Sequence, residues 1–365
     1  MSDDSGKLLV AVIDPSESYR RQVSQSLLAS YRVVAFESGD EALMRLAGAP
    51  PNILLVDNWT PPEGGGQLIR ELRKGNLMPG VPIIYTDVAD PPAVRSAALE
   101  CGADAYLTKP YRRSVLIQTI STHINRSVER RWESLPKLQR ESLVCTLSAF
   151  NHIGELIKRD ETIAFTSVVE ACTPLVEAVG QRQFKEILRE VRNHDDYSYA
   201  HSVGTATLLL LFGYTIGLQE PDLSLLGSGG LLLDVGKMMI PSELLNKTGD
   251  LTMDELDLIK SHVQLSIEYL EKSPDIPKNI LTIAGEHHER LDGSGYPKGL
   301  KKGQLNELAR MAAIVDVFAA MTERRAYRPS MSAEAALKIM TEDRAPQFDQ
   351  KLLALFREML LDTAT

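Results

Sequence analysis

This sequence has few cysteines and no excess of basic charge. Its 365 residues include three cysteines, Cys101, Cys145 and Cys172, which lie far apart and outside any CxxC pattern. They predict reduced thiols of a cytoplasmic protein and argue against a disulfide-stabilised scaffold. The formal net charge is -9. This charge argues against a protein that coats nucleic acid, because such proteins carry a basic face.

Long apolar runs are also missing. The longest stretch without a charged residue runs from Ser202 to Gln219, but glycine and threonine interrupt it. A buried helix is therefore expected there, and no insertion into a membrane. The polar, acidic start "MSDDSGK" is unlike a signal peptide.

Short apolar runs recur through the first 125 residues, with amphipathic helical patterns between them. The runs are LLVAVI (8–13), RVVAF (32–36), ILLV (53–56), VPIIY (81–85) and AYL (105–107). Strands that alternate with helices predict βαβ units and a parallel sheet. The expected architecture is a doubly wound α/β domain of the (βα)5 type over residues 1–125.

Four polar residues, Asp14, Asp57, Thr86 and Lys109, each come directly after a predicted strand or at its end. In parallel sheets the carboxyl ends of the strands form the site, so these side chains are expected to converge. Together they resemble a response-regulator receiver domain over about residues 7–125. The resemblance implies that Asp57 is the phosphoacceptor, Asp14 a magnesium-site acid, Thr86 the switch hydroxyl, Lys109 the phosphate-binding cation and Tyr106 the switch aromatic. It also implies a cognate histidine kinase.

One departure concerns the acids after the first strand. The family usually has two consecutive acids there, whereas this chain has Asp14-Pro15. Magnesium requires hard oxygen ligands in octahedral geometry, so weak magnesium binding is expected. The alternative is a receiver that keeps its fold as a dimerisation module and is poorly phosphorylated.

The middle of the chain reads as helical and non-catalytic. Apolar residues from Leu116 to Ile124 suggest the last receiver helix, and the charged stretch after it continues to a break at Pro136. Residues 126–190 are expected to form a helical connector and the first helices of the output domain. The basic charges of the connector are interpreted as a solvated helix face.

Histidines and two unusually placed acids mark the C-terminal half, residues 191–365. Of seven histidines, His123, His152 and His194 are interpreted as structural or surface residues. Asp234 closes the apolar run GGLLL, and Asp316 lies inside an otherwise apolar helical pattern. Buried carboxylates are costly unless they are paired or bind a metal. With these acids, four histidines form a candidate metal set: His201, His262, His287 and His288.

The chemistry of this set points to a transition metal. Imidazole and carboxylate donors suit iron, manganese or zinc better than calcium. Adjacent side chains diverge by about 100° on a helix, so His287 and His288 can both bind only if a cluster lies between them or the helix ends there. The glycines and proline of "LDGSGYPKGL" predict that end. Lys237, three residues after Asp234, would reach a phosphate.

Five ordered motifs carry a second resemblance. They are YSYAHS (197–202), LDVGKMMIP (233–241), KSHV (260–263), GEHHERLDGSGYPKGL (285–300) and IVDVFAAMTERRAYRP (314–329). Over about residues 191–345 they resemble the HD-GYP domain, an all-helical branch of the HD phosphohydrolases. Members of that family hydrolyse cyclic di-GMP at a di-iron or di-manganese site. A receiver joined to this domain resembles a two-component response regulator acting through a phosphorelay in bacterial signalling.

The resemblance implies roles for individual residues. One metal would be held by Asp234, His262, His287 and His288. The other would be held by His201, Asp234, Asp316 and a histidine directly before Asp234. Asp234 and Lys237 would be the catalytic residues. Substrate contacts would come from Lys237, Tyr296, Arg325 and Arg328, with Tyr296 at the guanine. A GGDEF-domain partner and a homodimer are also implied.

The chain departs from the HD-GYP pattern at two positions. The family's "HD" is Leu233-Asp234 here, and Ala319 stands where "DVFDAL" is usual. Leucine has no lone pair to offer a metal, so one bound iron or manganese ion is expected more than two. The sequence therefore favours a degenerate output with weak or no phosphodiesterase activity that acts by binding metal, nucleotide or a partner protein. The alternative is an active cyclic di-GMP phosphodiesterase that receiver phosphorylation controls, and a scaffold without ligand is a third option.

Overall fold

The computed structural model describes residues 7–364 except 90–91, 246, 248 and 324–330. The described chain divides into two compact units. One contains residues 7–131 and 193–196, and the other contains 132–192, 197–323 and 331–364. No helix among the described residues is long and apolar enough to cross a membrane.

The first unit is built on a five-stranded parallel sheet with the strand order β2-β1-β3-β4-β5. The predicted strands are confirmed with small shifts at their ends, as β1 (Leu9–Ile13), β2 (Arg32–Phe36), β3 (Ile53–Asp57), β4 (Ile83–Asp87) and β5 (Ala105–Thr108). The helices are α1 (Glu17–Leu27), α2 (Gly39–Leu46), α3 (Gly65–Lys74), α4 (Pro92–Glu100) and α5 (Arg113–Trp132). The strand order reverses between β1 and β3, which is where sheets of this type form their site.

Burial explains why the strands are almost continuously apolar. Every residue of β1, β3 and β4 is buried, because a parallel sheet is covered by helices on both faces. One face carries alternating residues such as Ala11, Leu54 and Ile83, which share a core with residues of α2, α3 and α4. Their alternation follows the two-residue period of a strand.

The helix of the connector is interrupted before Pro136, where the sequence predicts a break. α5 ends at Trp132, and the next helix begins directly after Pro136, which is its N-cap. Proline lacks the N–H that a helix interior needs but is tolerated where a helix starts. The three cysteines are unpaired, and Cys101 and Cys172 are buried.

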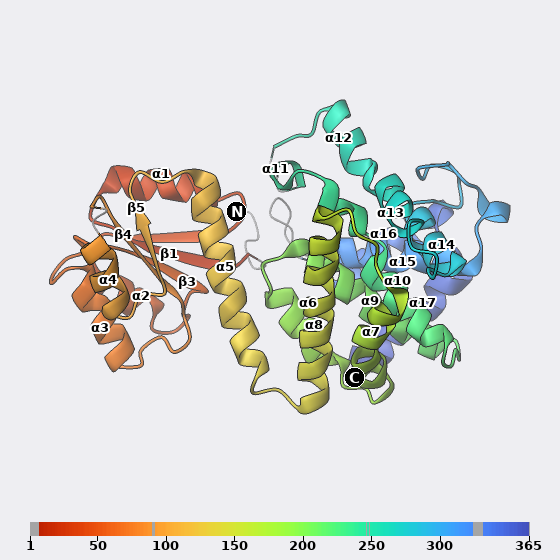
Figure 1. The fold of residues 1–365 in the computed structure, drawn as a ribbon, viewed down its shortest axis with the longest axis horizontal. Helices are drawn as coiled ribbons and strands as arrows, with labels where there is room; N and C mark the ends of the chain where they lie inside the picture. Colours follow the sequence, from red (N-terminus) through yellow and green to blue (C-terminus); the bar gives the residue numbers. More distant parts are fainter. Residues whose placement is uncertain (1–6, 90–91, 246, 248, 324–330, 365) are drawn as a thin grey trace. The chain divides into compact units, whose positions relative to one another are not determined.

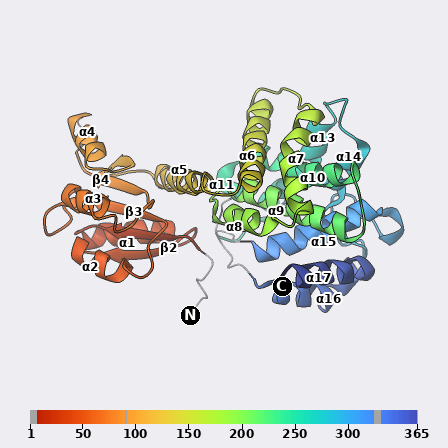
Figure 2. The same cartoon turned by 90° about the horizontal axis from the view of Figure 1, so that it is seen from below.

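The second unit is entirely helical in its described residues (Figures 1 and 2). Its first helices are α6 (Lys137–Lys158), α7 (Phe165–Gly180), α8 (Phe184–Asn193), α9 (Tyr197–Thr215) and α10 (Asp222–Leu232). Then come η1 (Val235–Met239), α11 (Ser242–Leu245), α12 (Met253–Lys260), α13 (His262–Leu270), α14 (Lys278–Glu286) and η2 (Lys302–Gln304). The last are α15 (Glu307–Thr322), α16 (Ala333–Thr341), η3 (Ala345–Gln347) and α17 (Gln350–Ala364).

Close packing at glycines brings the metal-site segments together. α9 and α10 lie side by side, and a Cβ added at Gly230 would lie only 2.4 Å from the Cα of Ala206. A Cβ at Gly236 would lie 2.0 Å from the carbonyl oxygen of His262. Any larger residue would push α10 away from α9 and η1 away from α13. Glycine at both positions therefore sets the distances between His201, Asp234 and His262.

Candidate metal centre and receiver site

Five helical segments supply the predicted metal ligands, and the structure brings all six ligands together. His201 lies on α9, Asp234 directly before η1, His262 at the start of α13, His287 and His288 after α14, and Asp316 inside α15. They form two groups whose ligand atoms lie within 4.8 Å of one another: Asp234, His262, His287 and His288 in one, and His201, Asp234 and Asp316 in the other. Asp234 belongs to both groups.

The adjacent histidines can both face the site because α14 ends there. Glu286 is the last residue of α14, and His287 is its C-cap. Gly295 allows the following loop to fold back, since a Cβ there would lie 2.5 Å from the His288 carbonyl oxygen. The predicted helix end is confirmed.

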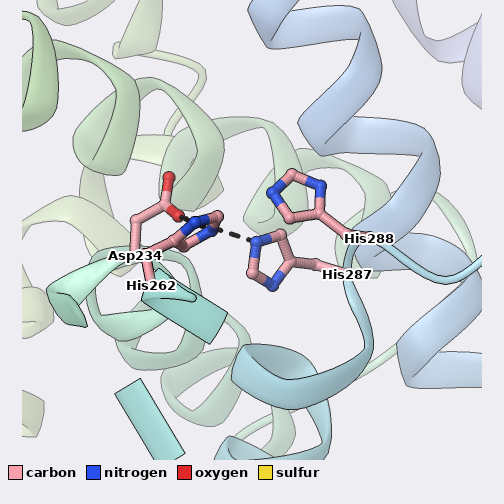
Figure 3. A group of neighbouring side chains, drawn as sticks. All are labelled: Asp234, His262, His287 and His288. Carbon is pink, nitrogen blue, oxygen red and sulfur yellow. Dashed lines mark ion pairs between the residues drawn. The ribbon is translucent and has the colours of Figure 1, made fainter. Parts of the chain in front are cut away.

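The ligand atoms of the first group face one another without a hydrogen bond between them among the described residues. Nε2 of His262 and Nε2 of His287 lie 3.1 and 3.6 Å from Oδ1 of Asp234 (Figure 3). All three atoms are buried without a hydrogen-bond partner among the described residues. The Nδ1 atoms donate to the carbonyl oxygens of Ile259 at 2.6 Å and Ala284 at 2.9 Å, which leaves Nε2 as the lone-pair nitrogen of each ring in its neutral form. Three buried acceptors in contact are unfavourable unless a cation lies between them.

His288 completes this group with a neutral ring. Burial and the neighbouring His287 lower the pKa of His288 to about 3, and a metal ligand needs an unprotonated nitrogen. Its ring stacks on Tyr296, with centroids 4.6 Å apart. The predicted substrate residue Tyr296 therefore lies directly beside a candidate metal ligand.

The second group has three donors. Nε2 of His201 lies 3.3 Å from Oδ2 of Asp234 and 3.2 Å from Oδ1 of Asp316. Leu233, directly before Asp234, is fully buried and contributes only hydrocarbon. This group therefore has three protein donors, whereas the first group has four.

Neighbouring lysine and histidine side chains keep the two acids ionised. Burial alone would raise the pKa of Asp234, but Lys237 and the facing imidazoles hold it well below its usual range. Nζ of Lys237 donates to Oδ2 of Asp234 at 2.5 Å. The pKa of Asp316 is likewise held well below its usual range against burial, chiefly by His288 and His201. Buried His and Asp clusters of this composition are consistent with metal binding.

Two acids that sequence reasoning missed support the site from outside. Oε2 of Glu323 lies 2.7 Å from Nδ1 of His201. Burial would lower the pKa of His201, but Glu323 and Asp316 outweigh it and raise the pKa to about 9. Glu289 is fully buried and accepts hydrogen bonds from the backbone N–H groups of Lys298 at 2.7 Å and Leu300 at 2.9 Å. Both acids lie inside the quoted motifs, but their partners depend on tertiary packing.

The remaining histidines and arginines have simpler outcomes. His123 and His194 are buried and His152 is exposed, and none joins either group. Arg325 and Arg328, predicted to contact phosphates, lie outside the described residues.

The predicted receiver residues also converge. Nζ of Lys109 donates to Oδ2 of Asp14 and, at 2.6 Å, to Oδ2 of Asp57. Burial would lower the pKa of Lys109, but the hydrogen bonds to these acids raise it above its usual value. Thr86 is the registered neighbour of Asp57 across β3 and β4. Tyr106 on β5 stacks on Tyr85 at 5.9 Å and donates its hydroxyl hydrogen to the carbonyl oxygen of Ala89.

Comparison with known proteins agrees with both domains. The model of the response regulator receiver domain matches residues 10–121, and that of the HD domain matches residues 185–352. The chain is 28% identical over 97% of its length to a probable cyclic di-GMP phosphodiesterase of Vibrio cholerae, covering 78% of that protein. It is 28% identical over 96% of its length to the cyclic di-GMP phosphodiesterase response regulator RpfG of Xanthomonas campestris, covering 87% of it.

A solved structure shares the fold. An HDG"Y"P protein of Bdellovibrio bacteriovorus matches 68% of this chain and 81% of its own, with a TM-score of 0.50 and 19% identity. At that identity the likeness concerns the fold alone.

Proposed function

We propose that this chain is a metal-dependent phosphodiesterase for a cyclic dinucleotide, cyclic di-GMP in the first instance. The premise is that it has a receiver α/β domain followed by an all-helical HD domain homologous to HD-GYP cyclic di-GMP phosphodiesterases. Receiver phosphorylation would control the output. The observation that carries the proposal is the four-donor group of Asp234, His262, His287 and His288.

The unpartnered atoms of this group support resident metal. Oδ1 of Asp234 and Nε2 of His262 and His287 are buried acceptors without hydrogen-bond partners in the described chain. A bound iron or manganese ion would supply Lewis-acid polarisation of a phosphoryl oxygen and a water of lowered pKa. The Nδ1 hydrogen bonds of both histidines fix the ring orientation that such an ion needs.

Residues beside this group suit an anionic nucleotide. The Lys237 ammonium, 2.5 Å from Oδ2 of Asp234, would form charge-assisted hydrogen bonds to a phosphate. The Tyr296 ring lies against His288, where a base would stack close to the metal ligands. We assign Arg325 and Arg328 to phosphate contacts on the motif alone.

The sequence favoured a degenerate output because of Leu233, whose effect would fall on the second group. The four-donor group contains no contribution from residue 233, and the full-length relatives bear phosphodiesterase names. Both points support the enzyme over the non-catalytic binder. The binder remains the second candidate, because the second group keeps three donors.

The test is hydrolysis of cyclic di-GMP by anaerobically purified full-length protein supplied with Fe(II) or Mn(II). Wild type, Leu233→His and the control Asp234→Asn are compared, each with and without Mg²⁺ and beryllofluoride as a phosphoryl mimic on Asp57. We expect wild-type turnover that Asp234→Asn abolishes and that beryllofluoride changes. Turnover by Leu233→His alone would favour the binder, and calorimetric titration of wild type with the nucleotide then decides whether it binds.

A further inference from the structure

The imidazole of His201 lies between two carboxylates, that of Asp316 inside α15 and that of Glu323, the C-cap residue of the same helix. Oδ1 of Asp316 is 3.2 Å from its Nε2, and Oε2 of Glu323 is 2.7 Å from its Nδ1. Since His201 is only 1% exposed, no solvent competes for these nitrogens. The Glu323 carboxylate accepts the Nδ1 proton, so Nε2 is turned towards Asp234 and Asp316, the other members of its group.

Glu323 occupies a space that a glycine provides. Gly204 lies on α9 three residues after His201, and a Cβ there would come 2.8 Å from Oε1 of Glu323. Glycine inside a helix costs about 0.5–1 kcal/mol relative to alanine. A methyl group here would crowd the end of the flexible Glu323 side chain, which would have to shift.

The helical spacing explains where Glu323 comes from. Residues 316 and 319 are related as i and i+3 and share one face of α15, the helix that packs on α9, and Glu323 is the C-cap residue directly after that helix. Ala319, between the two acids, is buried and stands where the HD-GYP pattern usually has an acid. The N–H of Glu323 donates to the Ala319 carbonyl oxygen at 2.8 Å. The backbone of Glu323 therefore lies one helical turn after that of Ala319.

We propose that Glu323 is the positioning residue of His201 and that it replaces, from one turn later, an acid at position 319. A longer side chain from a more distant backbone position thereby reaches the same imidazole. The proposal rests on the proposed function only in treating His201 as a metal ligand. It matters most in this chain, because Leu233 leaves the His201 group with three donors.

The first test is a spectroscopic signature that needs neither metal nor activity. In apo protein labelled with ring-¹⁵N histidine, seven histidines give seven ring systems, and His201→Asn identifies one of them. We expect a downfield, slowly exchanging proton on Nδ1 of His201. Glu323→Ala should abolish it, Glu323→Gln should retain it with a shift, and Ala319→Asp in the Glu323→Ala background should restore it. An unchanged signal in Glu323→Ala, or no restoration by Ala319→Asp, overturns the proposal.

The second test is Mn(II) titration calorimetry in the Leu233→His background, where the His201 group regains a fourth donor. Loss of an outer carboxylate costs about 10–100-fold in metal affinity. We expect Glu323→Ala to weaken the second ion by that factor, to leave the first ion unchanged, and to be rescued by Ala319→Asp. Equal loss at both ions, loss at neither, or no second ion in the Leu233→His parent counts against the proposal. Hydrolysis is not measured, so a failure of the proposed activity leaves both tests valid.

Discussion

Oδ1 of Asp234 and Nε2 of His262 lie 3.1 Å apart, buried, and neither has a hydrogen-bond partner among the described residues. Two acceptors in contact repel each other unless a cation joins them. This relationship is the physical argument for the proposed metal centre. It does not depend on any likeness to other proteins.

The first prediction concerns metal content and its effect on folding. Wild type purified with Mn(II) should retain an ion that His262→Gln loses, as measured by elemental analysis. A ligand present at about 100 times its Kd stabilises the native state by about 2.7 kcal/mol, so Mn(II) should raise Tm and a chelator should lower it. His152→Gln is the matched control, because His152 is exposed and outside both groups. Equal metal loss in both variants would refute the assignment.

The second prediction concerns the loop that carries Tyr296. The Glu289 carboxylate accepts the N–H groups of Lys298 and Leu300. Glu289→Ala leaves two N–H groups without this acceptor, and an unsatisfied buried group costs about 1–3 kcal/mol. We expect faster tryptic cleavage at Lys298 and weaker nucleotide binding.

The control for this variant is Glu271→Ala, which removes an exposed glutamate at the C-cap of α13. It should leave the cleavage rate at Lys298 unchanged. If Glu289→Ala cleaves no faster than Glu271→Ala, the carboxylate does not hold the loop.

The sequence predicted those structural features that depend on residues close together in the chain. The strand positions follow from buried apolar runs, and the end of α14 at Glu286 follows from the glycines after His288. Glu323 could not be found this way, because its partner His201 is 122 positions away. The ion pair between Lys237 and Asp234 was missed for another reason. The sequence suggested a phosphate for Lys237, and the proximity of the two charges depends on how η1 turns after Asp234.

The third prediction is a pH dependence from His123. Burial lowers the pKa of His123 below its ordinary value of 6.5, and its Nδ1 is buried without a hydrogen-bond partner in the described chain. Near pH 6.5 the unfolded chain therefore binds a proton at His123 more readily than the folded chain does. The free energy of unfolding falls as the pH drops below about 6.5. The slope reaches at most about 1.4 kcal/mol per pH unit.

His123→Phe removes the titration while keeping a ring of similar size. Urea unfolding of metal-free protein between pH 7 and pH 5 should lose less stability in this variant than in wild type. His152→Phe, at an exposed histidine, should follow the wild-type curve. Parallel curves for wild type and His123→Phe would contradict the prediction.

The fourth prediction concerns the receiver site, where Lys109 already pairs with both Asp14 and Asp57. With proline at position 15, these two carboxylates and one ammonium leave a net charge of about -1 for a magnesium ion, which prefers hard anionic oxygens. Pro15→Asp adds a carboxylate at that position, so we expect Mg²⁺ affinity to rise about tenfold or more, since 1.4 kcal/mol corresponds to a factor of ten.

Trp59 is a built-in probe, because it is 71% exposed and its backbone N–H donates to Oδ1 of Asp57. The other tryptophan, Trp132, is buried at 2% exposure and contributes a constant background. Titration of Trp59 fluorescence with Mg²⁺ should give a lower Kd for Pro15→Asp than for wild type, and Pro15→Ala should match wild type. If Pro15→Ala binds Mg²⁺ as tightly as Pro15→Asp, the rigid proline and not the missing charge weakens the site.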